Sequence, residues 1–165
     1  MSSPPPSRVE ALEGWGMACH ARSRVYRPES ADEVAASLQD ARRRGLTVVN
    51  RGGGLSYGDA ALNQGGATLV TTGLDGLLDF DPGTGVVRVG AGTTIGELWQ
   101  AVLPGGWWPP VVPGTMEVTV GGAVAMNVHG KNQLARGVFG DHVEALTVVR
   151  ADGRVERLTR EHDGH

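Results

Sequence analysis

The sequence lacks the features that mark disulfide-bonded, membrane-spanning and nucleic-acid-binding proteins. It contains one cysteine, Cys19, which excludes an internal disulfide and a cysteine-rich metal site. No apolar run approaches the roughly 20 residues of a membrane span, and the opening residues 1–7 lack the apolar core of a signal peptide. The formal net charge of −3 argues against a nucleic-acid partner, which would require a basic face. A cytoplasmic protein without a metal site is the default expectation.

Glycine, in contrast, is abundant. It makes up 26 of the 165 residues, roughly twice the usual share of about 7%. The glycines follow no strict period, which excludes a collagen-like chain. Among other places they cluster at 52–58, 90–96, 121–122 and 130–140. Such clusters suit a backbone that turns sharply or approaches a ligand closely.

Two helices are predicted from their capping signals. Ser30 is a good N-cap residue, Glu33 completes a capping box, and Gly45 is expected to end this first helix. The second helix is predicted over 94–103, where another capping box begins at Thr94. Both predictions depend on local sequence alone.

Strands and hairpins are predicted around these helices. The run 46–50 is expected to be a buried strand, and 67–72 another short strand. The folded domain is expected to span 9–165, and the mixture indicates an α+β fold. The remaining expectations are a disordered lead-in over 1–8, little periodic signal over 9–28, hairpins over 77–90 and 143–159, an extended segment over 107–118, and a tight turn with a short helix over 119–127.

Two common nucleotide-binding fingerprints fit this sequence poorly. The segment 90–96 lies between a strand and a helix, but its glycine spacing has one residue too many for a Rossmann loop. The acid at the expected distance, Glu117, lies in a proline-rich stretch, so a tight turn and helix start is the better interpretation. A phosphate-binding P-loop requires serine or threonine after Gly-Lys, whereas Asn132 follows Gly130 and Lys131.

The loop 51–59 is a better candidate for a phosphate site. It directly follows the predicted strand 46–50 and contains three consecutive glycines. Their missing Cβ atoms allow backbone N–H groups to converge on an anion. Ser56 adds a hydroxyl donor. Taken alone, the loop is equally compatible with an ordinary flexible turn.

A second candidate stretch covers 113–132. It begins with a sharp turn at 113–115, continues with small residues and donors over 119–122, and ends with His129 and Lys131. Each of these residues separately is compatible with a structural role, and a lone histidine most often has one. The density of small and polar residues between apolar segments favours a ligand site.

Together, these segments resemble a known family in their order and spacing. The strand followed by 51–59, then 113–115, 119–122 and 129–132, is similar to FAD-linked oxidases with the p-cresol methylhydroxylase-type FAD-binding domain of the vanillyl-alcohol oxidase superfamily. The similarity runs from about Trp15 to Thr159. It implies an α+β FAD-binding domain made of two small α/β subdomains. It also implies oxidation of a sugar-like CH–OH group by hydride transfer to flavin N5.

The resemblance also implies which residues contact FAD. Residues 50–60 would wrap the pyrophosphate, and His129 and Lys131 would lie near the isoalloxazine ring, where a lysine stabilises the anionic reduced flavin. It identifies neither a catalytic residue nor a metal ligand. The implied FAD-binding residues are Asn50, Arg51, Gly52, Gly53, Gly54, Leu55, Ser56, Tyr57, Gly58, Asp59, Gly114, Thr119, Val120, Gly121, Gly122, Met126, Asn127, Val128, His129 and Lys131.

The sequence departs from the family pattern in two ways. Many members carry histidine where Leu55 stands and attach FAD covalently, so non-covalent FAD is expected here. Members are also much longer and have a separate substrate domain, so the chain is expected to be a fragment, a truncated product or a degenerate copy. The alternatives left open are an FAD-binding fragment without independent activity, a flavoprotein like the sugar-lactone oxidases, and a remnant that does not fold stably alone.

Overall fold

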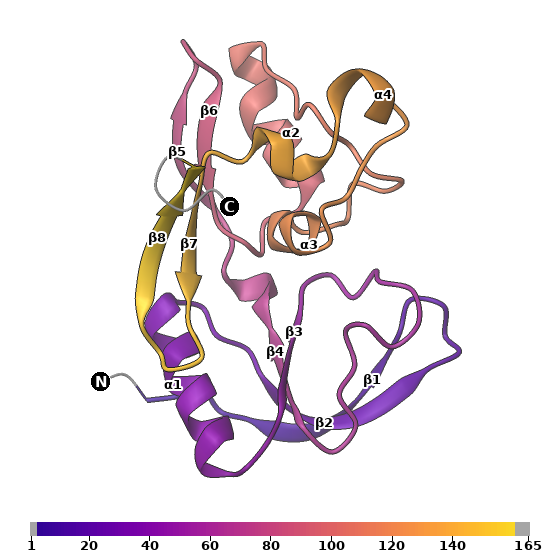
Figure 1. The fold of residues 1–165 in the computed structure, drawn as a ribbon, viewed down its shortest axis with the longest axis vertical. Helices are drawn as coiled ribbons and strands as arrows, with labels where there is room; N and C mark the ends of the chain where they lie inside the picture. The colour runs from indigo at the N-terminus through magenta and orange to yellow at the C-terminus, as the bar shows by residue number, and fades with distance from the viewer. Residues whose placement is uncertain (1–2, 161–165) are drawn as a thin grey trace. The chain divides into compact units, whose positions relative to one another are not determined.

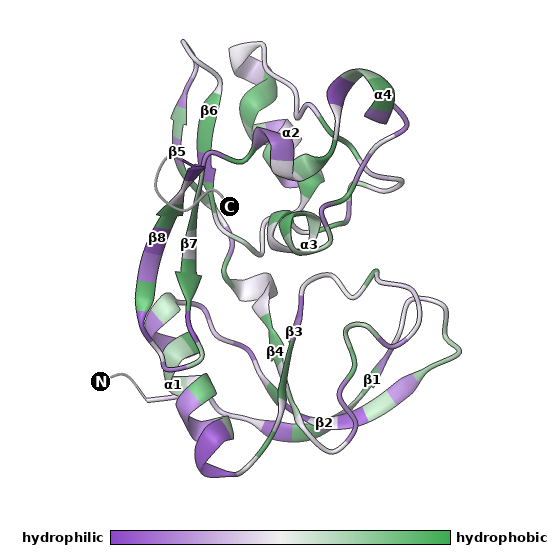
Figure 2. Ribbon diagram, in the orientation of Figure 1, coloured by the Kyte–Doolittle hydropathy of each residue, from purple (hydrophilic) through white to green (hydrophobic). Residues whose placement is uncertain are grey.

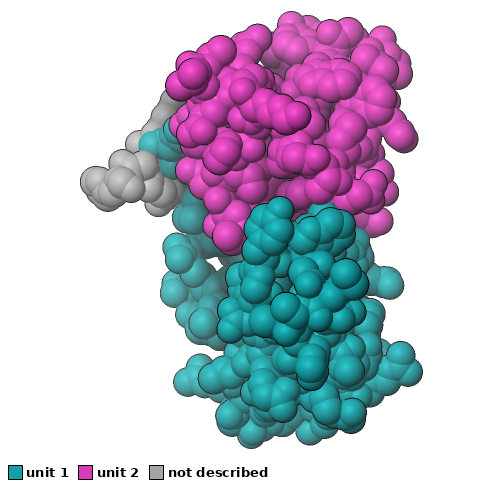
Figure 3. Space-filling model, turned by 90° about the vertical axis from the view of Figure 1, so that its right-hand side faces the viewer, with its two compact units in different colours: residues 1–73, 144–165 teal, residues 74–143 magenta. Residues whose placement is uncertain are grey.

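The structure, a computed structural model, describes residues 3–160. Its elements form two compact units, one of residues 1–73 and 144–165 and one of residues 74–143 (Figures 1 and 3). Each unit combines helices with β-strands, which agrees with the expected α+β fold of two small subdomains. Within the described part of the chain, no helix is long and apolar enough to cross a membrane.

The first unit is built on a four-stranded sheet in the order β1-β2-β4-β3. β1 (Arg8–Glu13) pairs antiparallel with β2 (His20–Tyr26). β4 (Ala67–Val70) lies between β2 and β3 (Val48–Arg51) and runs parallel to both. β4 is the buried centre of the sheet, because its first three residues have no exposed surface.

The pairing of β1 with β2 was not predicted. The inward positions of β2 are occupied by Ala21, Ser23 and Val25, all nearly fully buried. Ala21 and Ser23 have small side chains, and that of Ser23 is also polar. The strand therefore shows weak hydrophobic alternation in the sequence. The buried Ser23 hydroxyl instead lies 2.8 Å from the hydroxyl of Thr68 on β4 and forms a hydrogen bond with it.

The prediction of a disordered lead-in over 1–8 is wrong at its C-terminal end. Arg8 already belongs to β1, where it pairs with Val25. Ser7 is also tied to the sheet, because its carbonyl oxygen and hydroxyl accept hydrogen bonds from Arg24. Residues 1 and 2 lie outside the described residues.

The prediction of a buried strand over 46–50 is wrong in its burial. β3 lies at the edge of the sheet, where β4 is its only neighbour. Val48 and Asn50 are exposed, whereas Val49 and Arg51 are half-buried. An edge strand has a neighbouring strand on one side only and is more open to solvent, so an apolar run does not by itself establish burial.

Helix α1 (Ala31–Arg43) packs on this sheet around a core of Tyr26, Ala41, Ala67 and Leu69. The predicted cap is present, since the Ser30 hydroxyl accepts the Glu33 N–H at 3.2 Å. The carboxylate of Glu33 accepts from Glu29 instead of Ser30, one residue further back than a capping box requires.

The C-terminal hairpin also belongs to the first unit. β7 (Ala145–Val149) pairs antiparallel with β8 (Val155–Thr159), as predicted from the turn between them. β7 lies in contact with α1. Figure 2 shows β7 as largely hydrophobic and β8 as mixed. This composition suits a hairpin that covers a helix with one strand.

The second unit contains one hairpin and three α-helices. β5 (Leu77–Asp81) and β6 (Val86–Val89) form the hairpin predicted over 77–90. The remaining elements are α2 (Ile95–Val102), α3 (Val120–Ala125) and α4 (Gln133–Arg136), with short 3₁₀ turns at Leu103–Gly105 and Phe139–His142. The predicted capping box of α2 is complete, and 107–118 carries no helix or strand before α3 begins. The four-residue α4 was not predicted.

A buried polar network stabilises the first unit. The hydroxyl of Tyr26, which has no exposed surface, donates to Asp40 Oδ2 at 2.7 Å. Arg44 donates to the same carboxylate at 2.7 Å, and Arg43 donates to it at 3.1 Å. Hydrogen bonds from Arg44 and then Tyr26 lower the pKa of Asp40 to about 2.

We expect Asp40→Ala to lower the free energy of unfolding by about 1–3 kcal/mol at neutral pH, because the Tyr26 hydroxyl loses its buried acceptor. The folded pKa lies below the unfolded value of about 3.9, so the charged carboxylate stabilises the fold above that pH. This contribution is lost as the pH falls toward 2. Urea unfolding at neutral and acidic pH should therefore show a smaller difference between wild type and variant in acid.

Tyr26→Phe is the matched control for this prediction. It removes the hydroxyl but leaves the carboxylate and its arginines in place, so we expect a smaller loss of about 1 kcal/mol. A difference between wild type and Asp40→Ala that stays constant from neutral to acidic pH would contradict the assignment.

Candidate functional site

The candidate loop 52–58 begins the connection from β3 to the parallel strand β4. Among the described residues, no backbone N–H group from Gly53 to Gly58 donates a hydrogen bond within the protein. Gly53 and Gly58 are exposed, and the residues between them are exposed or half-buried. A row of unpaired N–H groups at the surface is a ready site for an anion.

The rest of this connection is fixed by side chains that bond to the backbone. Asn63 Nδ2 donates to the carbonyl oxygens of Thr47 and Ala67 at 3.0 and 3.1 Å. Gln64 accepts the N–H of Arg22 at 2.7 Å. The segment 61–66 is thus attached to the sheet through these two side chains.

Arg51, the last residue of β3, also supports the loop. Its Nη2 donates to the carbonyl oxygen of Glu13 at 2.8 Å, and its Nη1 to that of Ala61 at 3.4 Å. The turn after β1 packs on the same loop, because a Cβ at Gly14 would lie 2.6 Å from the Gly58 carbonyl oxygen. The sequence prediction missed Glu13, Gly14 and Ala61. No side-chain pattern in a sequence marks a backbone carbonyl group as a contact.

The second glycine segment, 90–96, uses its donors within the protein. Gly92 donates to Leu74, and the first two residues of α2, Ile95 and Gly96, donate to Val118 and Met116 at 2.9 Å each. The N-terminus of α2 therefore offers no set of free N–H groups to a phosphate. This supports the interpretation of 90–96 as a tight turn and helix start.

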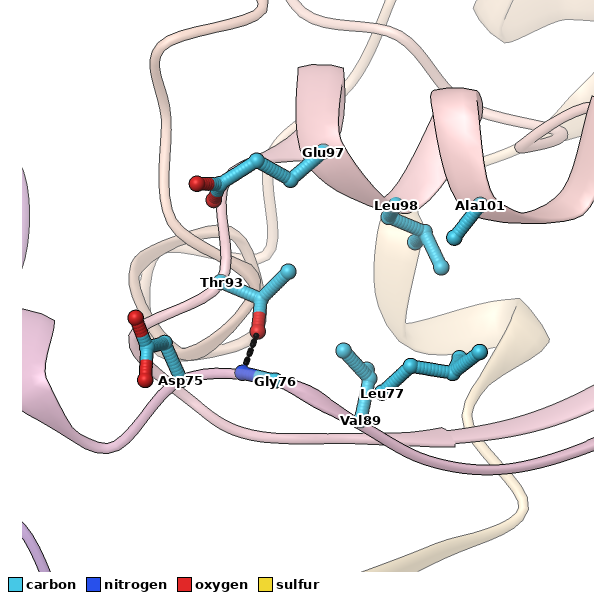
Figure 4. Close-up of a pocket in the computed structure, with 8 residues that line it drawn as sticks. All are labelled: Asp75, Gly76, Leu77, Val89, Thr93, Glu97, Leu98 and Ala101. Carbon is cyan, nitrogen blue, oxygen red and sulfur yellow. Dashed lines mark hydrogen bonds between the residues drawn. The ribbon is translucent and has the colours of Figure 1, made fainter.

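A small hollow beside this turn contains an acidic side chain (Figure 4). It is lined by Asp75, Gly76, Leu77, Val89, Thr93, Glu97, Leu98 and Ala101, none of which is a candidate cofactor residue. The Thr93 hydroxyl accepts the Gly76 N–H at 2.9 Å. The Glu97 carboxylate accepts the backbone N–H and the hydroxyl of Thr94, and these bonds lower its pKa. Glu97 therefore completes the capping box of α2.

In the third glycine segment, 119–122, the backbone N–H groups also donate to acceptors within the protein. Val120 donates to Thr93 and Gly121 to Ala91, both at 2.8 Å, and the Thr119 hydroxyl accepts the Gly122 N–H at 3.2 Å. A Cβ at Gly121 would lie 2.9 Å from the Ala91 carbonyl oxygen. These glycines let α3 approach the 91–93 turn closely. They could make room for a ligand through their small size, but they offer it no free N–H donors.

Residues 126–131 follow α3 and are mostly exposed. Met126 is 61% exposed, and His129 and Lys131 are exposed as well. Asn127 has a positive φ of 43°, and its side-chain oxygen accepts the Gly140 N–H at 2.9 Å. Val128 is half-buried and accepts the Phe139 N–H. The stretch is therefore fixed through Asn127 and Val128 and presents its larger side chains to solvent.

The segment 110–112, just before the predicted turn at 113–115, lies next to the end of this stretch within the second unit. A Cβ at Gly130 would lie 2.6 Å from the carbonyl oxygen of Val112. Asn132 Nδ2 donates to the Pro110 carbonyl oxygen at 3.0 Å. The structure thus brings 110–112 beside 130–132, while residues 50–59 belong to the first unit. In the part of the chain that the structure describes, no group of His, Cys, Asp and Glu could hold a metal ion.

Sequence comparisons identify relatives of this chain. Residues 23–159 match the family described as FAD binding domain. The chain is 38% identical over 155 residues to decaprenylphosphoryl-β-D-ribose oxidase of Mycolicibacterium smegmatis, covering 93% of this chain and 34% of that protein. It is 33% identical to a D-lactate dehydrogenase of Archaeoglobus fulgidus, covering 79% of this chain and 30% of that protein. The chain thus spans about a third of the length of these curated relatives.

Solved structures agree on the fold. The chain superposes with a TM-score of 0.83 and 23% identity on 6-hydroxy-D-nicotine oxidase of Arthrobacter nicotinovorans, covering 98% of this chain and 38% of that one. The TM-score is 0.81, at 20% identity, for glucooligosaccharide oxidase of Acremonium strictum, covering 93% of this chain and 35% of that one. That enzyme is described with a 6-S-cysteinyl, 8α-N1-histidyl FAD. At these identities the likeness establishes the fold alone.

Proposed function

The chain belongs to the FAD-binding domain family of flavin-dependent oxidoreductases, and on this premise we propose that it holds FAD non-covalently in an enzyme that oxidises a sugar-like CH–OH group. The single observation that carries the proposal is the loop from Gly53 to Gly58, whose N–H groups have no acceptor among the described residues. FAD contains a diphosphate, which is the kind of anion that such a row of donors recognises.

The residues present fit that group. Compared with 90–96 and 119–122, which use most of their donors within the second unit, the loop 52–58 has a continuous row of free donors. We assign the diphosphate to 52–58 for this reason. The segments 113–115, 119–122 and 126–131 are assigned to the rest of the cofactor, where small residues admit its bulk and Lys131 supplies a cation.

Non-covalent attachment is proposed from the chemistry of the loop. A histidyl or cysteinyl linkage requires an imidazole or a thiol, and residues 50–59 contain neither. Leu55 stands where many members of this family carry the linking histidine, and its side chain has no nucleophile. The backbone N–H donors and the shape of the loop would then hold the cofactor.

The bound flavin ring would supply the hydride acceptor for an alcohol substrate. The part that this chain plays is to bind and orient the cofactor and to balance its charge. Lys131 is exposed and makes no hydrogen bond or ion pair with another described residue, so its ammonium group is free to face an anion. We propose that it stabilises the negative charge of the reduced ring.

The substrate class is proposed from the relatives. One is named for a phosphorylated ribose derivative, another for D-lactate, and both names indicate a secondary alcohol. The higher identity and coverage of the first favour a sugar-like donor. The second candidate function is FAD binding without turnover by this chain alone. The observation that favours it is the length, since the chain covers 34% of the first relative.

We expect the purified protein to be yellow and to release all of its flavin as FAD on acid precipitation. The measurement is the flavin absorbance of the supernatant and of the washed pellet. Flavin that stays with the pellet would contradict non-covalent binding, and a colourless protein that cannot be loaded with FAD would contradict the proposed function. Bleaching of the bound flavin by a sugar with an oxidisable CH–OH group would distinguish turnover from FAD binding alone.

We expect Gly53→Val to weaken FAD binding at least about tenfold, because its side chain would shield neighbouring N–H groups and restrict the backbone at the anion site. The dissociation constant is measured by quenching of flavin fluorescence. Gly16→Val is the matched control, since Gly16 lies in the same unit and a Cβ there meets nothing within 4 Å. Unchanged affinity in Gly53→Val would refute the assignment of the loop.

We expect Lys131→Met to shift the reduction potential of bound FAD to a more negative value, because the anionic reduced ring loses a neighbouring cation. The measurement is a spectroscopic redox titration. Arg136→Met, which removes an exposed cation at the end of α4 in the same unit, is the control. Equal potentials in wild type and Lys131→Met would exclude this role.

A further inference from the structure

The guanidinium group of Arg51 differs in its partners from several other arginines of the first unit. Arg8, Arg27, Arg43 and Arg44 all pair with carboxylates. Arg51 is half-buried and, within residues 3–160, forms no ion pair. Its hydrogen bonds go to two neutral carbonyl oxygens, and desolvation lowers its pKa. Its positive charge is therefore uncompensated in the described part of the protein.

This charge lies directly against the candidate diphosphate loop. A Cβ at Gly54 would fall 2.6 Å from Arg51 Cζ, so the guanidinium group fills the space where a side chain would otherwise stand. Gly54 also has a positive φ of 72°, a conformation that L-residues rarely adopt. The loop backbone thus lies against the guanidinium group, and the positive φ favours glycine at this position.

The two carbonyl contacts explain why an arginine is suited to this position. The planar fork spans Glu13 at the end of β1 and Ala61 in the return segment. It therefore connects three parts of the chain that are distant in sequence. A lysine ammonium group carries the same charge but lacks the fork geometry needed for both contacts.

We propose that Arg51 is the positioning residue of the diphosphate loop: its side chain holds the loop from beneath and supplies the positive charge that favours a diphosphate above it. This inference rests on the proposed FAD site and deepens it. An unpaired guanidinium group is disfavoured in a half-buried position until an anion approaches. The bound diphosphate would be that anion, acting through the loop and its N–H groups.

The test compares FAD dissociation constants of wild type, Arg51→Gln and Arg51→Lys at low and high ionic strength. We expect Arg51→Gln to weaken binding about tenfold or more at low ionic strength and to show a weaker dependence on salt, because the charge is lost. Arg51→Lys should also bind more weakly but keep the salt dependence of wild type. Arg24→Gln is the matched control, since Arg24 likewise donates to a carbonyl oxygen of the first unit, that of Ser7.

Gly54→Ala provides a second route if Arg51→Gln does not fold. It keeps the charge but displaces the guanidinium group, so we expect weaker FAD binding with an unchanged salt dependence. A loss of affinity in Arg51→Gln that is equal at both ionic strengths would reduce Arg51 to a structural residue and overturn the inference. Wild-type affinity in Gly54→Ala or Arg51→Lys would overturn the positioning role. Failure of wild type to bind FAD would instead refute the proposed function itself.

Discussion

The parallel pairing of β3 with β4 is the constraint on which the candidate site depends. Parallel neighbours cannot be joined by a tight turn, so the chain must return along the sheet through residues 52–66. This return contains no helix, and side chains take over the task of fixing it. Arg51 and Asn63 bond to backbone carbonyl groups at its two ends. The glycine-rich half between them is held in place while its own N–H groups stay free.

Glycine content alone does not distinguish this loop from the other two. In the second unit, the 90–96 and 119–122 segments place small residues where α2, α3 and the 91–93 turn approach one another. Their N–H groups find acceptors on neighbouring segments, and the helix N-termini are closed to an anion. The same residue type therefore serves packing in one unit and donor exposure in the other. Whether these N–H groups are free depends on whether another segment places a hydrogen-bond acceptor next to them.

This division also clarifies what the chain contributes to an oxidoreductase. The family match and the free N–H donors of 52–58 concern the binding of a cofactor. Neither concerns the groups that recognise a substrate, and the chain covers about a third of its curated relatives. Under the proposed non-covalent binding, Leu55 would separate it from enzymes that link FAD through a histidine.

The sequence by itself determined the features with local causes. The caps at Ser30 and Thr94 and the two predicted hairpins follow from residues close together in the chain, and the family resemblance follows from the order of the glycine motifs. Only the tertiary structure decided that 46–50 forms an edge strand, that small residues on β2 are buried, and which glycine-rich loop keeps its donors free. Each of these depends on contacts between distant segments, because burial and hydrogen-bond satisfaction are set by what another part of the chain places there.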